Sequence, residues 1–95
     1  MVRHIVLFKL KEPTPENLRL CAEKFYSMRG KVPGLLELEA GFDFLHSERS
    51  YDLALNTVFD SRESFEAYQT HPAHMPVKVH MAQVREACVA VDYDI

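Results

Sequence analysis

The sequence has no tryptophan, three glycines and two cysteines, and each shortage argues against a class of site. The glycines are not clustered, so there is no glycine-rich loop to hold a phosphate. Cys21 and Cys88 lie far apart, and neither has the CxxC or Cys/His spacing of a zinc site. We therefore expect two free thiols in a reducing, cytoplasmic compartment, and no cofactor.

The chain also lacks a basic surface and a long apolar run. Its net charge is −3, with lysines and arginines scattered along the sequence, so a nucleic-acid partner is not expected. No apolar run approaches the roughly 20 residues that span a bilayer. The first apolar run covers only Ile5 to Phe8 before Lys9 and Lys11, which favours a strand over a signal peptide and predicts no membrane partner.

What remains is a composition suited to a small packed domain. The 95 residues are 47% apolar and 26% charged, which predicts one domain over residues 1–95. A chain this short buries only roughly 60–65% of its unfolded surface, so pairing with a second copy is favoured.

The first predicted strand covers residues 2–10 and alternates between two largely apolar sets. One set is Val2, His4, Val6, Phe8 and Leu10. The other is Arg3, Ile5, Leu7 and Lys9. This pattern predicts a strand that is covered on both faces.

A helix is predicted to follow, with Thr14 as N-cap, Pro15 in the first turn and Glu16 complementing the helix dipole. Its apolar stripe is Leu18, Cys21, Ala22, Phe25 and Met28. We expect Gly30 to end this helix.

Two further strands are predicted over residues 35–45 and 51–59, joined by a polar connection at 46–50. Gly41 indicates a bulge or a close approach of another segment. Alternation places one apolar set on a single face of each strand. These sets are Leu36, Leu38, Ala40, Phe42 and Phe44 in the first strand, and Leu53, Leu55, Thr57 and Phe59 in the second.

A second helix is predicted to begin at Asp60–Ser61, with Glu63 closing a capping box onto Asp60 or lying favourably in the first turn. Phe65 and Tyr68 share its inner face, and Pro72 is expected to end it. Residues 73–81 are predicted to be irregular with a turn or two of helix, and residues 84–93 to form the last strand.

The order β-α-β-β-α-β predicts an α+β, ferredoxin-like fold with an antiparallel sheet and both helices on one face. The helices leave the second face uncovered, although Ile5, Leu7, Val89 and Val91 lie there. A bare apolar face of this kind marks an interface, so we predict a homodimer packed face to face as a dimeric α/β barrel.

Titratable groups concentrate between residues 61 and 81, where Tyr68, His71, His74 and His80 lie near two prolines. A neutral imidazole removes a proton next to a carbonyl, and a phenol stabilises the enolate oxygen. Alternatively, the histidines bind backbone carbonyls and Tyr68 packs in the core with its hydroxyl satisfied.

The chain resembles the stress-responsive α/β-barrel (Dabb) family. The resemblance lies in the opening RHIVLFKLK, in the YxxHPAH of Tyr68 to His74, and in the closing VDY of residues 91–93. It implies a homodimeric ferredoxin-like barrel. In a plant polyketide-cyclase branch of the family, which performs an intramolecular aldol condensation, the key tyrosine and histidine resemble Tyr68 and His74.

The same branch implies a role for His4 on the first strand. It also departs from this chain, because a further pocket histidine falls at Leu53 and an aromatic residue falls at Ala22. The resemblance thus implies the acid–base pair rather than the polyketide substrate. Without it, His4 on this strand is typical of a hydrogen-bonded core residue.

Two other interpretations of these residues are weaker. His71 and His74 have i, i+3 spacing, but Pro72 interrupts the helix between them and no third metal ligand is evident, short of one from a partner chain. Phe25, Tyr26 and Phe65 are typical of a core rather than of a cofactor site. We therefore predict no metal site.

Two function classes share one predicted pocket. Either the protein binds a small apolar or aromatic molecule, or it is a cofactor-independent lyase with His74 as base and with Tyr68 and His4 orienting the substrate. A cofactor-free monooxygenase is a third option, by analogy of fold alone. The predicted ligand-binding residues are Val6, Phe8, Phe25, Leu38, Leu53, Leu55 and His71.

Overall fold

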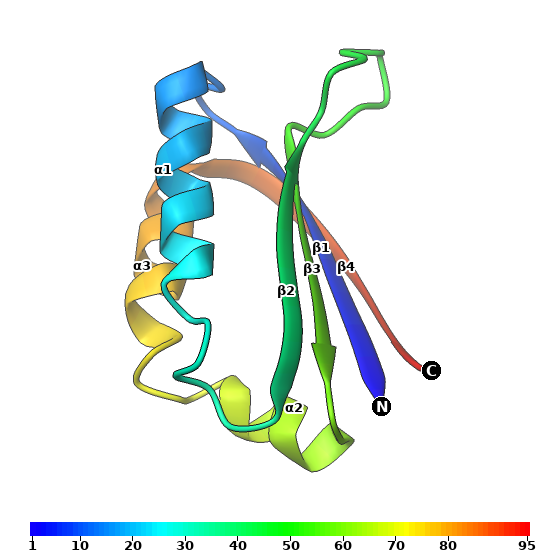
Figure 1. Ribbon diagram of the computed structural model, residues 1–95. Coiled ribbons are helices and arrows are strands. Elements are labelled where there is room, and N and C mark those ends of the chain that lie inside the picture. Colours follow the sequence, from blue (N-terminus) through cyan, green and yellow to red (C-terminus); the bar gives the residue numbers. More distant parts are fainter.

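The computed structural model describes all residues, 1–95, and has the predicted ferredoxin-like fold with one additional helix. Its elements are β1 (Val2–Leu10), α1 (Pro15–Tyr26), β2 (Leu35–Phe42), β3 (Leu53–Phe59), α2 (Arg62–Tyr68), α3 (Met75–Val84) and β4 (Arg85–Asp94). The strands form one antiparallel sheet in the order β2-β3-β1-β4. Helices α1 and α3 cover one face of this sheet, and α2 lies at one end of it (Figure 1).

Strand β1 has the alternation predicted from the sequence. Its helix-facing side chains Val2, Phe8 and Leu10 are buried, whereas Leu7 on the opposite face is 37% exposed. β1 pairs with β3 on one side and with β4 on the other, so it holds the centre of the sheet together with β3. Because β1 lies in the middle of the sheet, every second side chain faces the helices along its whole length.

Helix α1 begins as predicted but ends early. The Thr14 hydroxyl accepts a hydrogen bond from the amide of Asn17 at 3.2 Å, and Pro15 occupies the first turn. The helix ends at Tyr26, where Ser27 is the C-cap, and not at Gly30 as predicted. The chain continues in tight turns to Gly30, whose φ of 73° lies in the left-handed region.

Strand β2 is shorter than predicted and contains a bulge near its start. Leu35 pairs with Phe59 and Glu37 pairs with Val58, so the register shifts between them. The bulge turns Leu35 toward the core and leaves Leu36 54% exposed, which corrects the prediction that Leu36 shares a face with the buried Leu38.

The predicted end of β2 and the predicted start of β3 were both wrong, because the loop between the two strands is longer than predicted. β2 ends at Phe42 rather than at residue 45, and β3 starts at Leu53 rather than at residue 51. Phe44 therefore lies in the loop and is 89% exposed. Gly41 marks neither the bulge nor a close approach, because a Cβ atom there would meet nothing within 4 Å.

The second helical region differs most from the prediction. Ser61, not Asp60, is the N-cap of α2, and its hydroxyl accepts from the amide of Ser64 at 3.1 Å. The helix ends at Tyr68, four residues before Pro72. The following helix α3 has ten residues instead of a turn or two, since Pro76 lies in its first turn, where a missing N–H breaks no hydrogen bond.

The core lies between the sheet and the helices, with Phe25, Met28, Phe59 and Tyr68 among its largest buried side chains. The opposite face of the sheet carries the exposed Leu7, Val89, Val91 and Tyr93. β4 is an edge strand that pairs only with β1. None of the helices is both long enough and apolar enough to cross a membrane.

Candidate ligand pocket

A short turn brings the rings of Tyr68 and His74 together. Tyr68 is the last residue of α2, and the amide of His71 donates to its carbonyl at 3.2 Å. The His71 ring stabilises the turn, because its Nδ1 accepts from the amide of Ala73 at 3.0 Å. The turn folds His74 back onto Tyr68, so the two rings stack with centroids 3.8 Å apart and planes 14° apart.

The contacts of His74 fix which ring nitrogen is free. Its Nδ1 lies 3.0 Å from the carbonyl oxygen of Tyr68, and a carbonyl oxygen only accepts, so Nδ1 donates the proton. The neutral ring then carries its lone pair on Nε2. Burial lowers the pKa of His74 to about 4, because desolvation disfavours the imidazolium more than the Tyr68 carbonyl favours it. His74 is therefore neutral near pH 7.

Tyr68 supplies a hydroxyl without a partner in the chain. Its side chain is 2% exposed, and desolvation raises its pKa, so the phenol stays protonated. No fully enclosed side-chain nitrogen or oxygen atom in the protein lacks a hydrogen bond. The Tyr68 hydroxyl and His74 Nε2 make none, so neither atom is fully enclosed, and both residues line a pocket.

His4 adds a third polar ring beside this pair. The β1–β4 register places His4 opposite Asp92, and its Nδ1 contacts the Asp92 carboxylate. A carboxylate accepts, so this nitrogen is the donor and the ring is held in one orientation. The His4 ring meets Tyr68 edge-on at 6.3 Å between centroids and lies 5.0 Å from Phe65.

These rings line a largely apolar pocket of about 490 Å³. Ten of its 15 lining residues are hydrophobic, and they come from the sheet and from all three helices. Phe8 and Phe25, which stack at 5.6 Å between centroids, form part of its wall. The residues predicted for the pocket that do line it are His4, Val6, Phe8, Phe25, Leu55, Tyr68 and His74.

Three residues predicted for the pocket do not line it. Leu38 and Leu53 are 5% and 2% exposed, respectively, and pack in the closed core. The His71 ring instead accepts a hydrogen bond from the amide of Ala73 within the turn. The face of each strand was predicted correctly for these leucines, but neither side chain lines the pocket.

Sequence reasoning missed the wall that follows His74. This wall comes from α3 and the start of β4, with Gln69 from the turn, and comprises Gln69, Val77, Lys78, Val79, Met81, Ala82, Arg85 and Cys88. One signal was present, since Val77 and Met81 are spaced i, i+4 after a proline that suits a first turn. Both are buried.

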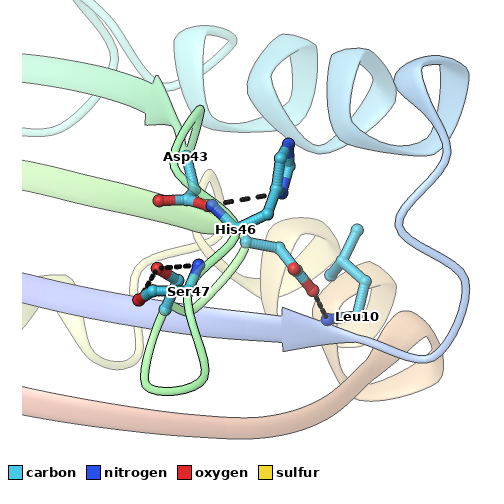
Figure 2. Close-up of polar contacts among 6 residues, drawn as sticks. Leu10, Asp43, His46 and Ser47 are labelled. Carbon is cyan, nitrogen blue, oxygen red and sulfur yellow. Dashed lines mark hydrogen bonds and ion pairs between the residues drawn. The ribbon is translucent and has the colours of Figure 1, made fainter.

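The remaining histidines lie outside the pocket. His80 Nε2 is 3.8 Å from Cys21 Sγ between α3 and α1. His46 lies in the β2–β3 loop, where its amide donates to Asp43 at 2.7 Å and Ser47 contacts Ser50 (Figure 2). The Asp52 carboxylate accepts from the amide of Leu10 at 2.8 Å, which fastens the loop to β1. Leu10 is labelled at this contact in the same close-up.

The structure brings no three His, Cys, Asp or Glu side chains close enough together to bind a metal ion. His71 and His74, which are three positions apart in the sequence, instead make separate contacts with the backbone of the turn. Both cysteines are free thiols, as predicted, with Cys21 buried and Cys88 exposed.

The fold and this pocket define a small ferredoxin-like α+β domain with a mostly apolar cavity. The family model of the Stress responsive A/B Barrel Domain matches residues 2–95, so the chain belongs to the Dabb family. An uncharacterized protein of Streptomyces coelicolor is 32% identical over 77 residues, which is 78% of this chain and 79% of that protein.

Solved structures share the fold over nearly the whole chain. A dimeric ferredoxin-like protein from Thermobifida fusca has a TM-score of 0.88 at 27% identity and covers 99% of this chain and 90% of its own. A dimeric protein from Bacteroides fragilis has a TM-score of 0.83 at 29% identity, with 99% and 95% covered. The hydroxynitrile lyase of Passiflora edulis, at 19% identity and a TM-score of 0.86 with 99% and 92% covered, shows likeness of fold alone.

Proposed function

We propose that the protein binds a small, largely apolar molecule in the pocket lined by Tyr68 and His74. The observation that carries this proposal is the pairing of apolar walls with two unpartnered polar atoms, the Tyr68 hydroxyl and His74 Nε2. Neither atom is fully enclosed, so both can hydrogen-bond to a molecule that enters the pocket. A ligand that supplied one acceptor and one donor would satisfy both atoms.

The size of the pocket is suited to a small ligand. Its volume of about 490 Å³ falls within the roughly 300–1,000 Å³ of small-molecule sites. The rings are held before any ligand arrives, since the turn after α2 positions His74 on Tyr68 and the contact with Asp92 holds His4. Preorganisation of this kind raises affinity, because less freedom is lost on binding.

We also propose a homodimer that pairs through the uncovered sheet face. Ile5, Leu7, Val89 and Val91 lie together there, on neighbouring strands that pair Ile5 with Val91 and Leu7 with Val89. The related proteins from Thermobifida fusca and Bacteroides fragilis, both described as dimeric, support this arrangement. Two sheets facing each other would form the dimeric barrel. A cytoplasmic location stays a prediction.

A second candidate function is a cofactor-independent lyase reaction of the aldol type. The specific observation in its favour is the free lone pair of His74 Nε2 beside the free Tyr68 hydroxyl. Nε2 would take a proton from a carbon next to a carbonyl, and the electron pair of that bond would form an enolate. The Tyr68 hydroxyl would donate to the enolate oxygen, with His4 beside it. Because a base with a pKa of about 4 is weak, the substrate must carry an activated C–H bond.

One set of variants tests the binding proposal and separates it from the lyase. Ligands found by a fragment screen should raise the melting temperature of the wild type and should bind Tyr68→Phe and His74→Ala at least about fivefold more weakly. The control is His46→Asn in the distant loop, which should bind like the wild type.

If the reaction occurs, His74→Ala should lower turnover by roughly 10²–10⁴ with little change in affinity. Fragments that bind all four proteins equally would place the ligand elsewhere and refute the proposal.

A further inference from the structure

The charges around the pocket differ in sign from the charge of the whole chain. The protein has 14 acidic and 11 basic residues, for a net charge of −3. Among the 15 residues that line the pocket, Lys78 and Arg85 are the charged ones, and no aspartate or glutamate is present. The pocket is thus a positive site in a negative molecule.

Neither of these two cations is neutralised by another side chain. The ion pairs of the protein join His4 to Asp92, Arg19 to Glu23, His46 to Asp43 and Arg62 to Asp94. Lys78 and Arg85 take part in none of them. Their positive charges are therefore available to a ligand.

Arg85 is the better placed of the two to bind a carboxylate. It caps the C-terminal end of α3 and begins β4, at the part of the pocket formed by Phe8 and Cys88. One of its terminal nitrogens donates to Cys88 Sγ at 3.0 Å, which is a weak, neutral acceptor. The other N–H groups of the guanidinium remain free, and their planar fork matches a carboxylate in two parallel hydrogen bonds.

Lys78 lies at the opposite end, near the polar rings. It is one turn into α3, where its amide donates to the His74 carbonyl at 3.0 Å and its Nζ donates to the Gln69 carbonyl at 3.2 Å. The ten residues of α3 span about 15 Å, which separates the His74 end from the Arg85 end. A ligand that filled the pocket would present different groups to the two ends.

We propose that the ligand is an organic anion, with a carboxylate bound by Arg85 and an apolar aromatic or acyl body against Phe8 and Phe25. A carbonyl or hydroxyl group at the other end of the molecule would meet Tyr68 and His74. This inference rests on the proposed function, since it specifies what the same pocket binds. It adds a requirement that apolar walls alone do not impose, namely a negative charge on the ligand.

The test compares ligands that differ only in charge. The probes are 4-phenylbutyrate, decanoate and 2-naphthoate, each with its neutral amide, together with 4-phenylbutylamine as a cation. Dissociation constants are measured by calorimetry and by NMR titration on the wild type, Arg85→Gln, Lys78→Gln and the control Lys31→Gln. Lys31 is exposed and lies outside the pocket, so the control removes the same charge elsewhere.

We expect the carboxylates to bind the wild type about 5- to 20-fold more tightly than their amides, and the amine not to bind. Arg85→Gln should remove this preference while leaving the affinity for the amides unchanged. Lys78→Gln should retain the preference for carboxylates, and Lys31→Gln should match the wild type. Higher salt should weaken the binding of the carboxylates and leave the binding of the amides unchanged.

The outcomes distinguish a failure of this inference from a failure of the pocket. If carboxylates and amides bind alike, or if Arg85→Gln keeps the preference, the anion inference is wrong and the apolar pocket stands. The anion inference is also wrong if neutral fragments from the screen bind the pocket but no carboxylate does. If no compound perturbs the resonances of Tyr68 and His74, both proposals fail.

Discussion

The two ring nitrogen atoms of His74 have different roles, because one holds the turn after α2 and the other is free to bind a ligand. Nδ1 is used by the Tyr68 carbonyl, and this bond closes the turn that positions the ring. Nε2 is left for whatever enters the cavity. Because the neutral ring is buried against Tyr68, the folded state disfavours protonation of His74. The stability of the fold should therefore depend on pH.

Acid should destabilise the protein partly through His74. The folded pKa of about 4 lies below the ordinary value of 6.5, so the unfolded state takes up the proton first as pH falls. This contribution is complete above pH 6.5 and is lost between pH 6.5 and 4. After allowance for solvent screening, it is on the order of 1–2 kcal/mol.

Urea denaturation of the wild type and His74→Gln at several pH values measures this contribution. The unfolding free energy of the variant should fall less steeply between pH 6.5 and 4. His80, whose pKa is also lowered by burial, acts in the same direction but is present in both proteins. The exposed-loop variant His46→Asn should follow the wild type, and parallel curves for His74→Gln would contradict the assignment.

The grouping of His4, Tyr68 and His74 could be predicted from the sequence, and their hydrogen bonds could not. Alternation in β1 put His4 on the helix side, and the prolines after Tyr68 indicated a turn. Which nitrogen of His74 faces the cavity depends on the carbonyl that the turn happens to present. Leu53 failed as a pocket residue for a related reason, because periodicity gives the face of a strand but not the space above it.

Among the secondary-structure elements, the connection from α1 to β2 packs tightly on the start of α2. Gly34 has a φ of 81°, and a Cβ atom there would lie 2.3 Å from Ser64 Oγ and 2.7 Å from Asp60 Oδ1. The Gly34 carbonyl also accepts from the amide of Asp60 at 2.9 Å. This contact joins segments that are far apart in sequence and places α2, and with it Tyr68.

Alanine substitution at the two left-handed glycines should separate backbone strain from crowding. Gly30→Ala introduces strain alone, because nothing lies within 4 Å, and should lower the unfolding free energy by about 1–2 kcal/mol. Gly34→Ala adds the collision with Ser64 and should lower it by about 3 kcal/mol or more. Chemical denaturation measures both, and equal losses would show that α2 yields easily to the added methyl group.

Element boundaries were less predictable than element types. Residues 73–81 were predicted to be irregular with only a turn or two of helix, whereas Pro76 lies in the first turn of α3 and leaves the helix intact. The bulge at Leu35 was invisible in the alternation of β2, since one extra residue reverses the faces only locally. The bounds of β1, which has largely apolar residues on both faces, were predicted correctly.

Across the complete domain, the sheet has one covered and one bare face. The exposed fractions of Val89, Val91 and Leu7 are 48%, 53% and 37%, respectively. These side chains lie beside one another on β4 and β1, opposite the pocket. A second sheet laid against them would cover the apolar band of both protomers by the same symmetric contact.

Placing a charge in this band should separate the protomers. Analytical ultracentrifugation should give about twice 11.0 kDa for the wild type and the monomer mass for Val91→Arg, because an unpaired charge buried in an apolar interface is strongly unfavourable. Leu20→Arg is the control, since Leu20 is 38% exposed on α1, away from this face. A wild type that sediments as a monomer at all concentrations would contradict the proposed dimer.

The position of β4 at the rim of the sheet has a consequence for handling the protein. The outer row of its amide and carbonyl groups has no strand beside it, and residues 87–91 (ACVAV) form a short uncharged, β-prone run between Glu86 and Asp92. Such a run on an open rim is a template for adding strands from other molecules. A variant that prevents the proposed dimer should therefore aggregate faster on storage, as fibrils or precipitate in which strands add along β4.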